Sequence, residues 1–251
     1  MFQRQQMNSK PPRISSPPDE PEQSAAGEPG SAKRRIFIVD DHAMFRDGLR
    51  RLIDLEPDLT VCGDAPDAAS GLRGMRETTP DLAIVDISLD STSGIDLIKS
   101  IKRDHDDMPV LVVSMHSESL YGDRALRAGA MGYVMKSEPA TTVVAAIRKV
   151  LSGNVHISER MATLVVSKFV KGEPDQVPSP LEALSDRELE VFRMIGQGKG
   201  TREIAQEMNV ALPTISSFKN RIKEKLNFKN STEMILFALQ WFRQETPDSE
   251  I

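Results

Sequence analysis

The chain has few of the features that mark secreted, disulfide-bonded or membrane proteins. Cys62 is the single cysteine among 251 residues, which excludes an internal disulfide framework and suits a reducing cytosol. No apolar run approaches the roughly 20 residues of a membrane span, and the N-terminus lacks the apolar core of a signal peptide. We therefore expect a cytoplasmic protein that does not contact membranes.

The formal charge is unevenly distributed along the chain. The net charge is −5, yet residues 185–245 hold ten Lys and Arg against eight Asp and Glu, so this segment carries +2 and the remainder −7. Five of these cations lie within residues 214–230, where Glu224 is the single acid. An acidic first part joined to a locally basic last part suits a regulatory domain attached to a nucleic-acid-binding domain.

Proline-rich segments divide the chain. Residues 1–32 contain six of the sixteen prolines and almost no bulky apolar side chains, so burial cannot offset the entropy of ordering them and we expect disorder. The stretch 171–180 contains three prolines and is typical of a linker. We predict an α/β domain at 33–155, a linker helix and flexible linker at 156–180, a helical domain at 181–245 and a disordered tail at 246–251.

Short aliphatic runs alternate with helical patterns in the α/β domain. Such runs are typical of strands buried on both faces of a parallel sheet. The predicted strands are Arg35–Val39, Leu59–Cys62, Leu82–Val85, Val110–Val113 and Gly132–Met135. The predicted helices lie near Ala43–Leu55, Asp67–Glu77, Gly94–Arg103, Leu120–Ala128 and Thr141–Ser152. The pattern predicts a doubly wound, five-stranded parallel sheet of the α/β class.

Five polar residues each follow one of these aliphatic runs. They are Asp40 and Asp41 after the first run, Asp86 after the third, Ser114 after the fourth and Lys136 after the fifth. Ligands of such sheets bind outside the carboxyl ends of the strands, so the five should meet at one edge. Three carboxylates would repel one another unless a cation joins them, and Mg²⁺ prefers oxygen ligands. One aspartate can then attack a phosphoryl group, whose charge Lys136 would neutralise.

This spacing resembles the receiver domain of bacterial two-component response regulators over about residues 34–152. The resemblance implies that Asp86 is the phosphoacceptor and that Lys136 binds the phosphoryl group. It also implies a Mg²⁺ site formed by Asp41, Asp86 and the carbonyl of Ser88, with Asp40 assisting through water.

The resemblance extends to residues around the acidic cluster, with one departure. Ser114 and Tyr133 are similar to the switch pair of the family, a hydroxyl that moves to the phosphoryl group and an aromatic ring that follows it. Ser88 and His116 correspond to variable positions that tune dephosphorylation. The departure is Asp90, which stands where the family usually has proline.

Residues 181–245 have helical periodicity and no strand pattern. The predicted helices lie near Asp186–Ile195, Arg202–Met208, Pro213–Lys225 and Thr232–Arg243. The second and third are joined by a four-residue turn, with the small Ala205 at their crossing, which is typical of a helix-turn-helix. The second helix of such a unit fits the DNA major groove.

Residues 184–242 resemble the four-helix DNA-binding domain of the LuxR/FixJ (NarL-like) type. The resemblance is carried by LSDRELEVFRMIGQGKGTREIAQEMNV, then TI, then NRIKEKLNFKNSTEMILFAL. It implies that the helix near 213–225 recognises DNA and that the helix near 232–243 serves dimerisation. The DNA contacts that we predict are Thr214, Ser216, Ser217, Lys219, Asn220, Arg221 and Lys223.

The recognition helix departs from the family pattern at three positions. Ala211 replaces the usual N-cap serine, and Pro213 and Ser216 replace two frequent lysines. The missing cap costs roughly 1 kcal/mol. Base readout then falls to Ser216, Ser217 and Asn220, so we expect an unusual operator and weaker binding than in relatives with lysine.

Together the resemblances imply a DNA-binding response regulator. A sensor histidine kinase would phosphorylate it, and it would act as a homodimer on double-stranded DNA, with RNA polymerase as a further candidate partner. It would be no enzyme beyond catalysing its own phosphorylation and dephosphorylation.

Two other functions stay open. One is a transcription regulator whose receiver is a dimerisation or protein-binding module without phosphate control. The other is an Asp-nucleophile phosphatase, which is disfavoured because such enzymes need a D-x-D motif, whereas Asp40 and Asp41 are adjacent and followed by His42. His42, His105 and His156 form no metal-ligand spacing, so we expect solvated or capping roles for them.

Overall fold

The structure is a computed structural model that describes residues 32–89, 92–171 and 180–245. The predicted disordered segments, most of the flexible linker and the family departure at Asp90 lie outside these residues. None of the helices in the described ranges is long and apolar enough to cross a membrane.

The first domain is built on one parallel sheet. Its strands are β1 (Arg34–Val39), β2 (Leu59–Ala65), β3 (Leu82–Val85), β4 (Val110–Ser114) and β5 (Gly132–Met135). They pair in the order β2-β1-β3-β4-β5, and every pairing is parallel. The predicted α/β fold class is thereby confirmed. The order turns back between β1 and β3, where the carboxyl ends of neighbouring strands open toward a ligand.

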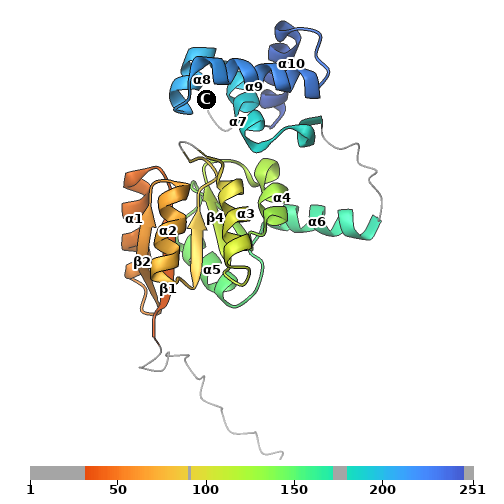
Figure 1. Ribbon diagram of the computed structural model, residues 1–251. Helices are drawn as coiled ribbons and strands as arrows, with labels where there is room; N and C mark the ends of the chain where they lie inside the picture. The colour runs from red at the N-terminus through yellow and green to blue at the C-terminus, as the bar shows by residue number, and fades with distance from the viewer. Residues whose placement is uncertain (1–31, 90–91, 172–179, 246–251) are drawn as a thin grey trace, which may run out of the picture. The chain divides into compact units, whose positions relative to one another are not determined.

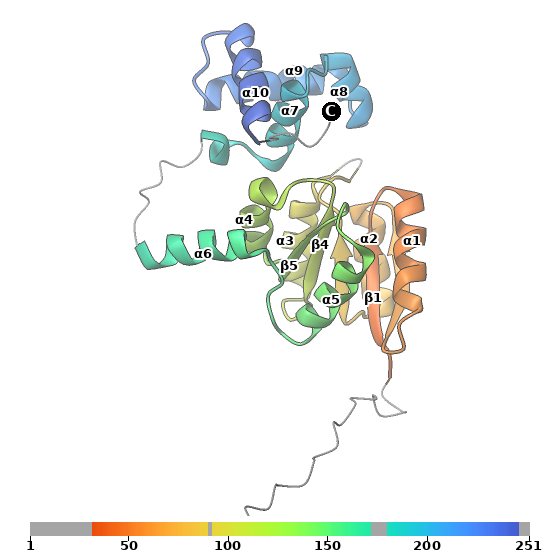
Figure 2. The same ribbon diagram turned by 180° about the vertical axis from the view of Figure 1, so that it is seen from behind.

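Helices cover both faces of this sheet (Figures 1 and 2). They are α1 (Ala43–Asp54), α2 (Ala68–Thr78), α3 (Gly94–Asp104), α4 (Glu118–Ala128) and α5 (Ala140–Leu151). Successive strand residues alternate between the faces. In β1, Ile36 and Ile38 pack in a core with residues of α1 and α5, whereas Phe37 and Val39 pack in a core with residues of α2, α3 and α4.

Strand β2 runs three residues further than its aliphatic run predicts. The pairing with β1 shifts register between Ile36 and Phe37, so that Phe37 pairs with Gly63 and Cys62 is passed over. A Cβ on Gly63 would lie 2.5 Å from the Phe37 ring, so glycine lets that ring pack against the strand. Glycine, a turn signal in sequence reasoning, here lies inside a strand next to a register shift.

The C-terminal part is helical, as predicted. Helix α6 (Glu159–Lys171) follows the first domain, and a short 3₁₀ turn, Pro180–Ala183, precedes four helices. These are α7 (Asp186–Gly196), α8 (Thr201–Glu207), α9 (Leu212–Lys225) and α10 (Ser231–Glu245). Ser185 and Glu188 form the predicted capping box at the start of α7, each side chain accepting the other's backbone N–H.

Candidate functional site

The parallel pairing of β1 and β3 brings two aspartates together. Asp40 follows β1 and Asp86 follows β3, and the Asp86 N–H donates to the carbonyl of Val39 at 2.9 Å. Both side chains are buried, with Asp40 2% and Asp86 1% exposed. Burial of a carboxylate is costly unless a cation or hydrogen-bond donors compensate for its lost hydration.

Lys136 supplies this compensation. Its Nζ lies 2.6 Å from Asp40 Oδ2 and 2.6 Å from Asp86 Oδ2, and its side chain is 3% exposed. The N–H of Lys136 donates to the carbonyl of Ser114 at 2.7 Å, which fixes the residue beside β4. The ammonium also lies 4.4 Å from the centroid of the Phe45 ring, a cation–π contact that sequence reasoning missed.

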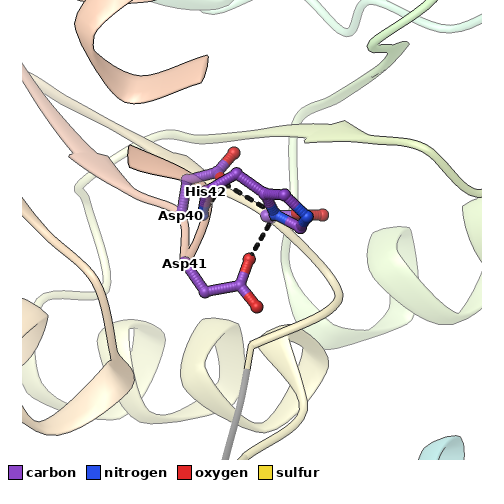
Figure 3. A group of neighbouring side chains, drawn as sticks. Asp40, Asp41 and His42 are labelled. Atoms are coloured by element: carbon purple, nitrogen blue, oxygen red, sulfur yellow. Dashed lines mark hydrogen bonds and ion pairs between the residues drawn. The ribbon is translucent and has the colours of Figure 1, made fainter. Parts of the chain in front are cut away.

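Asp41 and His42 complete the acidic cluster (Figure 3). His42 Nδ1 lies 2.6 Å from Asp41 Oδ1 and 3.5 Å from Asp40 Oδ1, and the His42 N–H donates to Asp40 Oδ1 at 2.8 Å. From the sequence, His42 is expected to have a solvated or capping role, because the histidines show no metal-ligand spacing. Its ring is exposed, but it lies beside the carboxylates; its place directly after the acidic pair was the available signal.

The donor set fits a divalent cation. One ligand atom from each of Asp40, Asp41, His42 and Asp86 lies within 4.8 Å of the others. Burial raises the pKa of Asp86 above its usual range, and the charge of Asp40 raises it further, although Lys136 opposes both. A bound cation would offset this repulsion, and Mg²⁺ accepts carboxylate oxygens with retained waters.

The predicted switch residues lie beside the acidic cluster. Ser114 is fully buried, and its hydroxyl interacts with the carboxylate of Asp86. The Tyr133 hydroxyl donates to the carbonyl of His116 at 2.8 Å, and the Tyr133 side chain is buried. Burial raises the pKa of Tyr133 well above its usual value, so the phenol is neutral at pH 7.

The two variable positions contact each other. Ser88 Oγ and His116 Nε2 lie 2.5 Å apart, and the His116 ring stacks on Tyr121 with centroids 4.7 Å apart. Burial lowers the pKa of His116 to about 3, so the ring is neutral at pH 7. The structure thus brings together two residues that the resemblance placed only separately near Asp86.

The loop after Asp86 is held by the start of α3. The Gly94 N–H donates to the carbonyl of Ile87 at 2.7 Å, and the Ser93 side chain caps the helix by accepting from Ile95 N–H. A Cβ on Gly94 would lie 2.0 Å from the carbonyl oxygen of Asp86. Only glycine allows α3 to approach the end of β3 this closely.

The second functional region is the helix pair α8 and α9. Ile204, Ala205 and Met208 on α8 and after it are buried, as are Ile215 and Ile222 on α9. These residues orient α9 so that five of the seven predicted DNA contacts are exposed. The exposed five are Thr214, Ser216, Ser217, Asn220 and Arg221, whereas Lys219 and Lys223 are half-buried.

Two of the predicted DNA contacts already have intramolecular partners. Lys219 Nζ lies 3.0 Å from Thr201 Oγ1 at the start of α8, and burial, with the charge of Lys223, lowers the pKa of Lys219. The Ser216 hydroxyl donates to the carbonyl of Leu212 at 3.2 Å. Sequence reasoning saw these residues as surface groups and gave no sign of either partner.

The N-terminus of α9 confirms the missing cap. Ala211 occupies the N-cap position in extended backbone conformation and offers no side-chain acceptor. The helix begins at Leu212, one residue before the predicted start, and Pro213 lies in its first turn, where proline is favourable.

Helix α10 has both buried and exposed apolar residues. Met234 and Ala238 are fully buried, whereas Ile235, Leu236 and Phe237 are 36%, 62% and 38% exposed. The family resemblance predicts that this helix serves dimerisation, and the exposed side chains of Ile235 and Leu236 are suitable for such a contact.

Comparison with known families gives the same two-part division. Residues 36–148 match the response regulator receiver domain, and residues 182–238 match the bacterial regulatory proteins of the luxR family. The chain therefore belongs to the response regulators that join a receiver domain to a LuxR-type DNA-binding domain.

Individual relatives match this chain along nearly their whole length. The oxygen regulatory protein NreC of Staphylococcus carnosus is 31% identical over 210 residues, which are 82% of this chain and 97% of NreC. The response regulator UvrY of Escherichia coli is 29% identical over 205 residues, with 82% and 93% covered.

Solved structures agree with the fold. A two-component response regulator of the LuxR family from Aurantimonas is 36% identical over 55% of this chain and 99% of its own, with a TM-score of 0.51. RcsB from Salmonella enterica, bound to promoter rprA with a phosphomimetic, is 25% identical with a TM-score of 0.54 and covers 83% of this chain and 99% of its own.

Proposed function

We propose that Asp86 accepts a phosphoryl group from a sensor histidine kinase and that this modification controls DNA binding. The observation that carries the proposal is the geometry of the buried carboxylate. Asp86 follows β3 and lies beside a second buried aspartate, with one ammonium 2.6 Å from both. A buried aspartate with a neighbouring cation and metal ligands is a suitable nucleophile for phosphoryl transfer.

The transfer forms one bond and breaks one. An oxygen of Asp86 bonds to phosphorus as the bond from phosphorus to the donor imidazole nitrogen breaks, and the electron pair leaves with that nitrogen. Lys136 binds a phosphoryl oxygen and loses its contact with Asp86 Oδ2 in doing so. Ser114 donates a hydrogen bond to another oxygen.

The Mg²⁺ site would be formed by Asp40, Asp41, Asp86 and the carbonyl of Ser88, with Asp40 acting through water. The metal, when bound, neutralises charge that develops on the phosphoryl oxygens. The residues of the chain supply the rest of the site. Asp40 holds Lys136 at 2.6 Å, and the fold keeps Asp86 and Lys136 away from bulk water.

The output of the switch is transcription. Phosphorylation adds about two negative charges, and we infer that Ser114 and Tyr133 respond to them and favour a homodimer on double-stranded DNA. Helix α9 would enter the major groove, and the exposed Ile235 and Leu236 of α10 would form the dimer contact. We also propose RNA polymerase as a further partner. A protein with these partners would act in the cytoplasm.

The test measures DNA binding with and without a small acyl phosphate donor and Mg²⁺. Wild-type protein should bind selected DNA several-fold more tightly after treatment, and intact mass should rise by one phosphoryl group. Asp86→Asn should show neither change and keep its fold. Asp107→Asn is the matched control, because Asp107 is an exposed aspartate before β4 at the other end of the strands.

The results separate this proposal from the alternative. If wild type and Asp86→Asn bind DNA equally in every condition, the receiver acts as a dimerisation or protein-binding module without phosphate control. A phosphoryl group found on another residue would overturn the assignment of Asp86.

A further inference from the structure

The recognition helix α9 is divided into an uncharged half and a basic half. Residues 212–218 read LPTISSF and carry no charge, whereas residues 219–225 read KNRIKEK and carry four cations and one acid. Cations bind phosphates without sequence preference. The N-terminal residues of a recognition helix approach base edges, so in this chain base readout falls to uncharged groups.

The exposed surface of that first half begins with two aliphatic residues and continues with the hydroxyls of Thr214, Ser216 and Ser217. Leu212 is 45% exposed at the first position of the helix, and Pro213 beside it is exposed. The buried Ile215 and Ile222 hold the helix against its domain, so its N-terminal turn cannot rotate Leu212 into the core. Leu212 therefore presents part of its apolar surface to solvent at the start of the recognition helix.

The serine hydroxyls in this half are weak candidates for base readout. The Ser216 hydroxyl donates to the carbonyl of Leu212, so a hydrogen bond from it to a base would have to replace this contact. Serine discriminates weakly between bases in any case, whereas the C5-methyl group of thymine is the apolar feature of the major groove. The apolar side chains of Leu212 and Pro213 are therefore suited to contact thymine and none of the other three bases.

We propose that Leu212 and Pro213 read thymine methyl groups in the major groove of the operator. The four cations in the second half of α9, with Arg202 exposed on α8, provide the charge that holds DNA against this apolar turn. The partner is thus double-stranded DNA with thymine at the position that faces the start of α9 in each half-site. This inference rests on the proposed DNA-binding function.

The experiment removes only the methyl groups. An operator is first selected from random DNA with the phosphorylated full-length protein. Each thymine is then replaced by deoxyuridine, which keeps every hydrogen-bonding group, and Kd is measured by fluorescence anisotropy. We expect a three- to fivefold rise in Kd at one or two positions of each half-site, the value of burying one methyl group.

Variants assign the effect to the residues. Leu212→Ala and Pro213→Ala should bind the thymine and deoxyuridine operators with similar Kd at the sensitive positions. Leu55→Ala, an exposed leucine in the receiver (83% exposed), should keep the wild-type ratio. Circular dichroism melting checks that each variant folds.

Three other outcomes would contradict the inference in distinguishable ways. Selective binding that ignores every thymine-to-uracil change overturns methyl readout and leaves DNA binding intact. Uracil sensitivity that persists in both variants assigns the readout to other residues. Failure to select any sequence overturns the proposed function and the methyl readout together.

Discussion

The functional side chains of the receiver site are buried, whereas those of the DNA-binding surface are exposed. In the receiver, Asp86 is 1% exposed and the Lys136 side chain 3%, so each must find its partner inside the fold. On α9, Leu212 is 45% exposed and Ser217 and Asn220 are also exposed, and the neighbouring core does not depend on them. A change at the first site should alter stability and chemistry together, whereas a change on α9 should alter binding alone.

Removal of the receiver lysine should produce the largest effect. Lys136→Met leaves Asp40 and Asp86 buried without their shared cation, and breaking a buried ion pair costs about 3 kcal/mol or more of unfolding free energy. Urea unfolding without divalent cations measures the loss. Added Mg²⁺ should restore part of it, because the metal replaces the missing positive charge.

A matched change on α9 tests the contrast. Lys219→Met removes a half-buried lysine that contacts Thr201, and we expect a loss of about 1 kcal/mol or less. Equal losses from the two lysine variants would show that burial does not separate the two regions as proposed.

Substitution of Gly94 should have the next largest effect. In Gly94→Ala the new Cβ would meet the Asp86 carbonyl oxygen and the Ile87 Cα, and such overpacking costs about 1–3 kcal/mol. Thermal and urea unfolding measure this cost, and slower phosphorylation should accompany it because Asp86 is displaced.

Gly48→Ala is the control in the same domain. A Cβ on Gly48 meets nothing within 4 Å, and the residue lies inside α1. It should stabilise the protein by up to about 1 kcal/mol through helix propensity. If Gly94→Ala is as well tolerated, the close approach of α3 to β3 is not needed.

A third prediction concerns the buried acid of the DNA-binding domain. Burial raises the pKa of Glu188, but Lys225 and the Ser185 N–H lower it by more, so the net pKa lies below 4.5. The stabilisation is therefore present above pH 4.5 and lost as pH falls through the folded pKa. Glu188→Gln should cost about 1 kcal/mol at pH 7.

The pH dependence is the diagnostic part of this prediction. The difference in unfolding free energy between wild type and Glu188→Gln should shrink as pH falls below 4.5. Glu224→Gln, an exposed acid on α9, should show little difference at either pH. A constant difference across the range would mean that the carboxylate charge does not contribute.

The smallest expected effect tests the cation–π contact. Phe45→Leu keeps an apolar side chain beside Lys136 but removes the ring face, which is worth about 0.5–1 kcal/mol for a partly exposed ring. Phosphorylation by a small donor, followed by intact mass, should slow by up to about fivefold. Phe45→Tyr keeps an aromatic ring and should keep the wild-type phosphorylation rate. A slow Phe45→Tyr variant would show that packing of the ring, and not its contact with the ammonium, sets the rate.

Much of the receiver site was predictable because its residues mark strand ends. Polar residues that follow buried aliphatic runs meet at one edge of a parallel sheet. Asp40, Asp86 and Lys136 could therefore be assigned to one site from the sequence. The contact between Ser88 and His116 could not be found this way, because it depends on how two loops bend. The same holds for Phe45, whose position on α1 shows burial but not its partner.

The DNA-binding domain was predictable for a different reason. Its signals are local: the capping box at Ser185 and Glu188 lies within one turn, and apolar spacing shows which face of α9 is buried. The exposure of individual side chains was harder to predict from the sequence. Lys219 has the positive charge expected of a phosphate contact, yet its ammonium donates to the Thr201 hydroxyl. The crossing angle of the two helices decides which group such a long side chain reaches.

The sequence by itself determined the order of elements, the two-part division and the edge of the sheet where the carboxylates meet. Periodicity reports burial within one element, and that information is local. The tertiary structure alone decided which groups satisfy one another: Lys136 pairs with Asp86 across 50 residues of sequence, and β2 extends past its aliphatic run because β1 offers it hydrogen bonds. Such pairings depend on distances between remote segments, which no local pattern encodes.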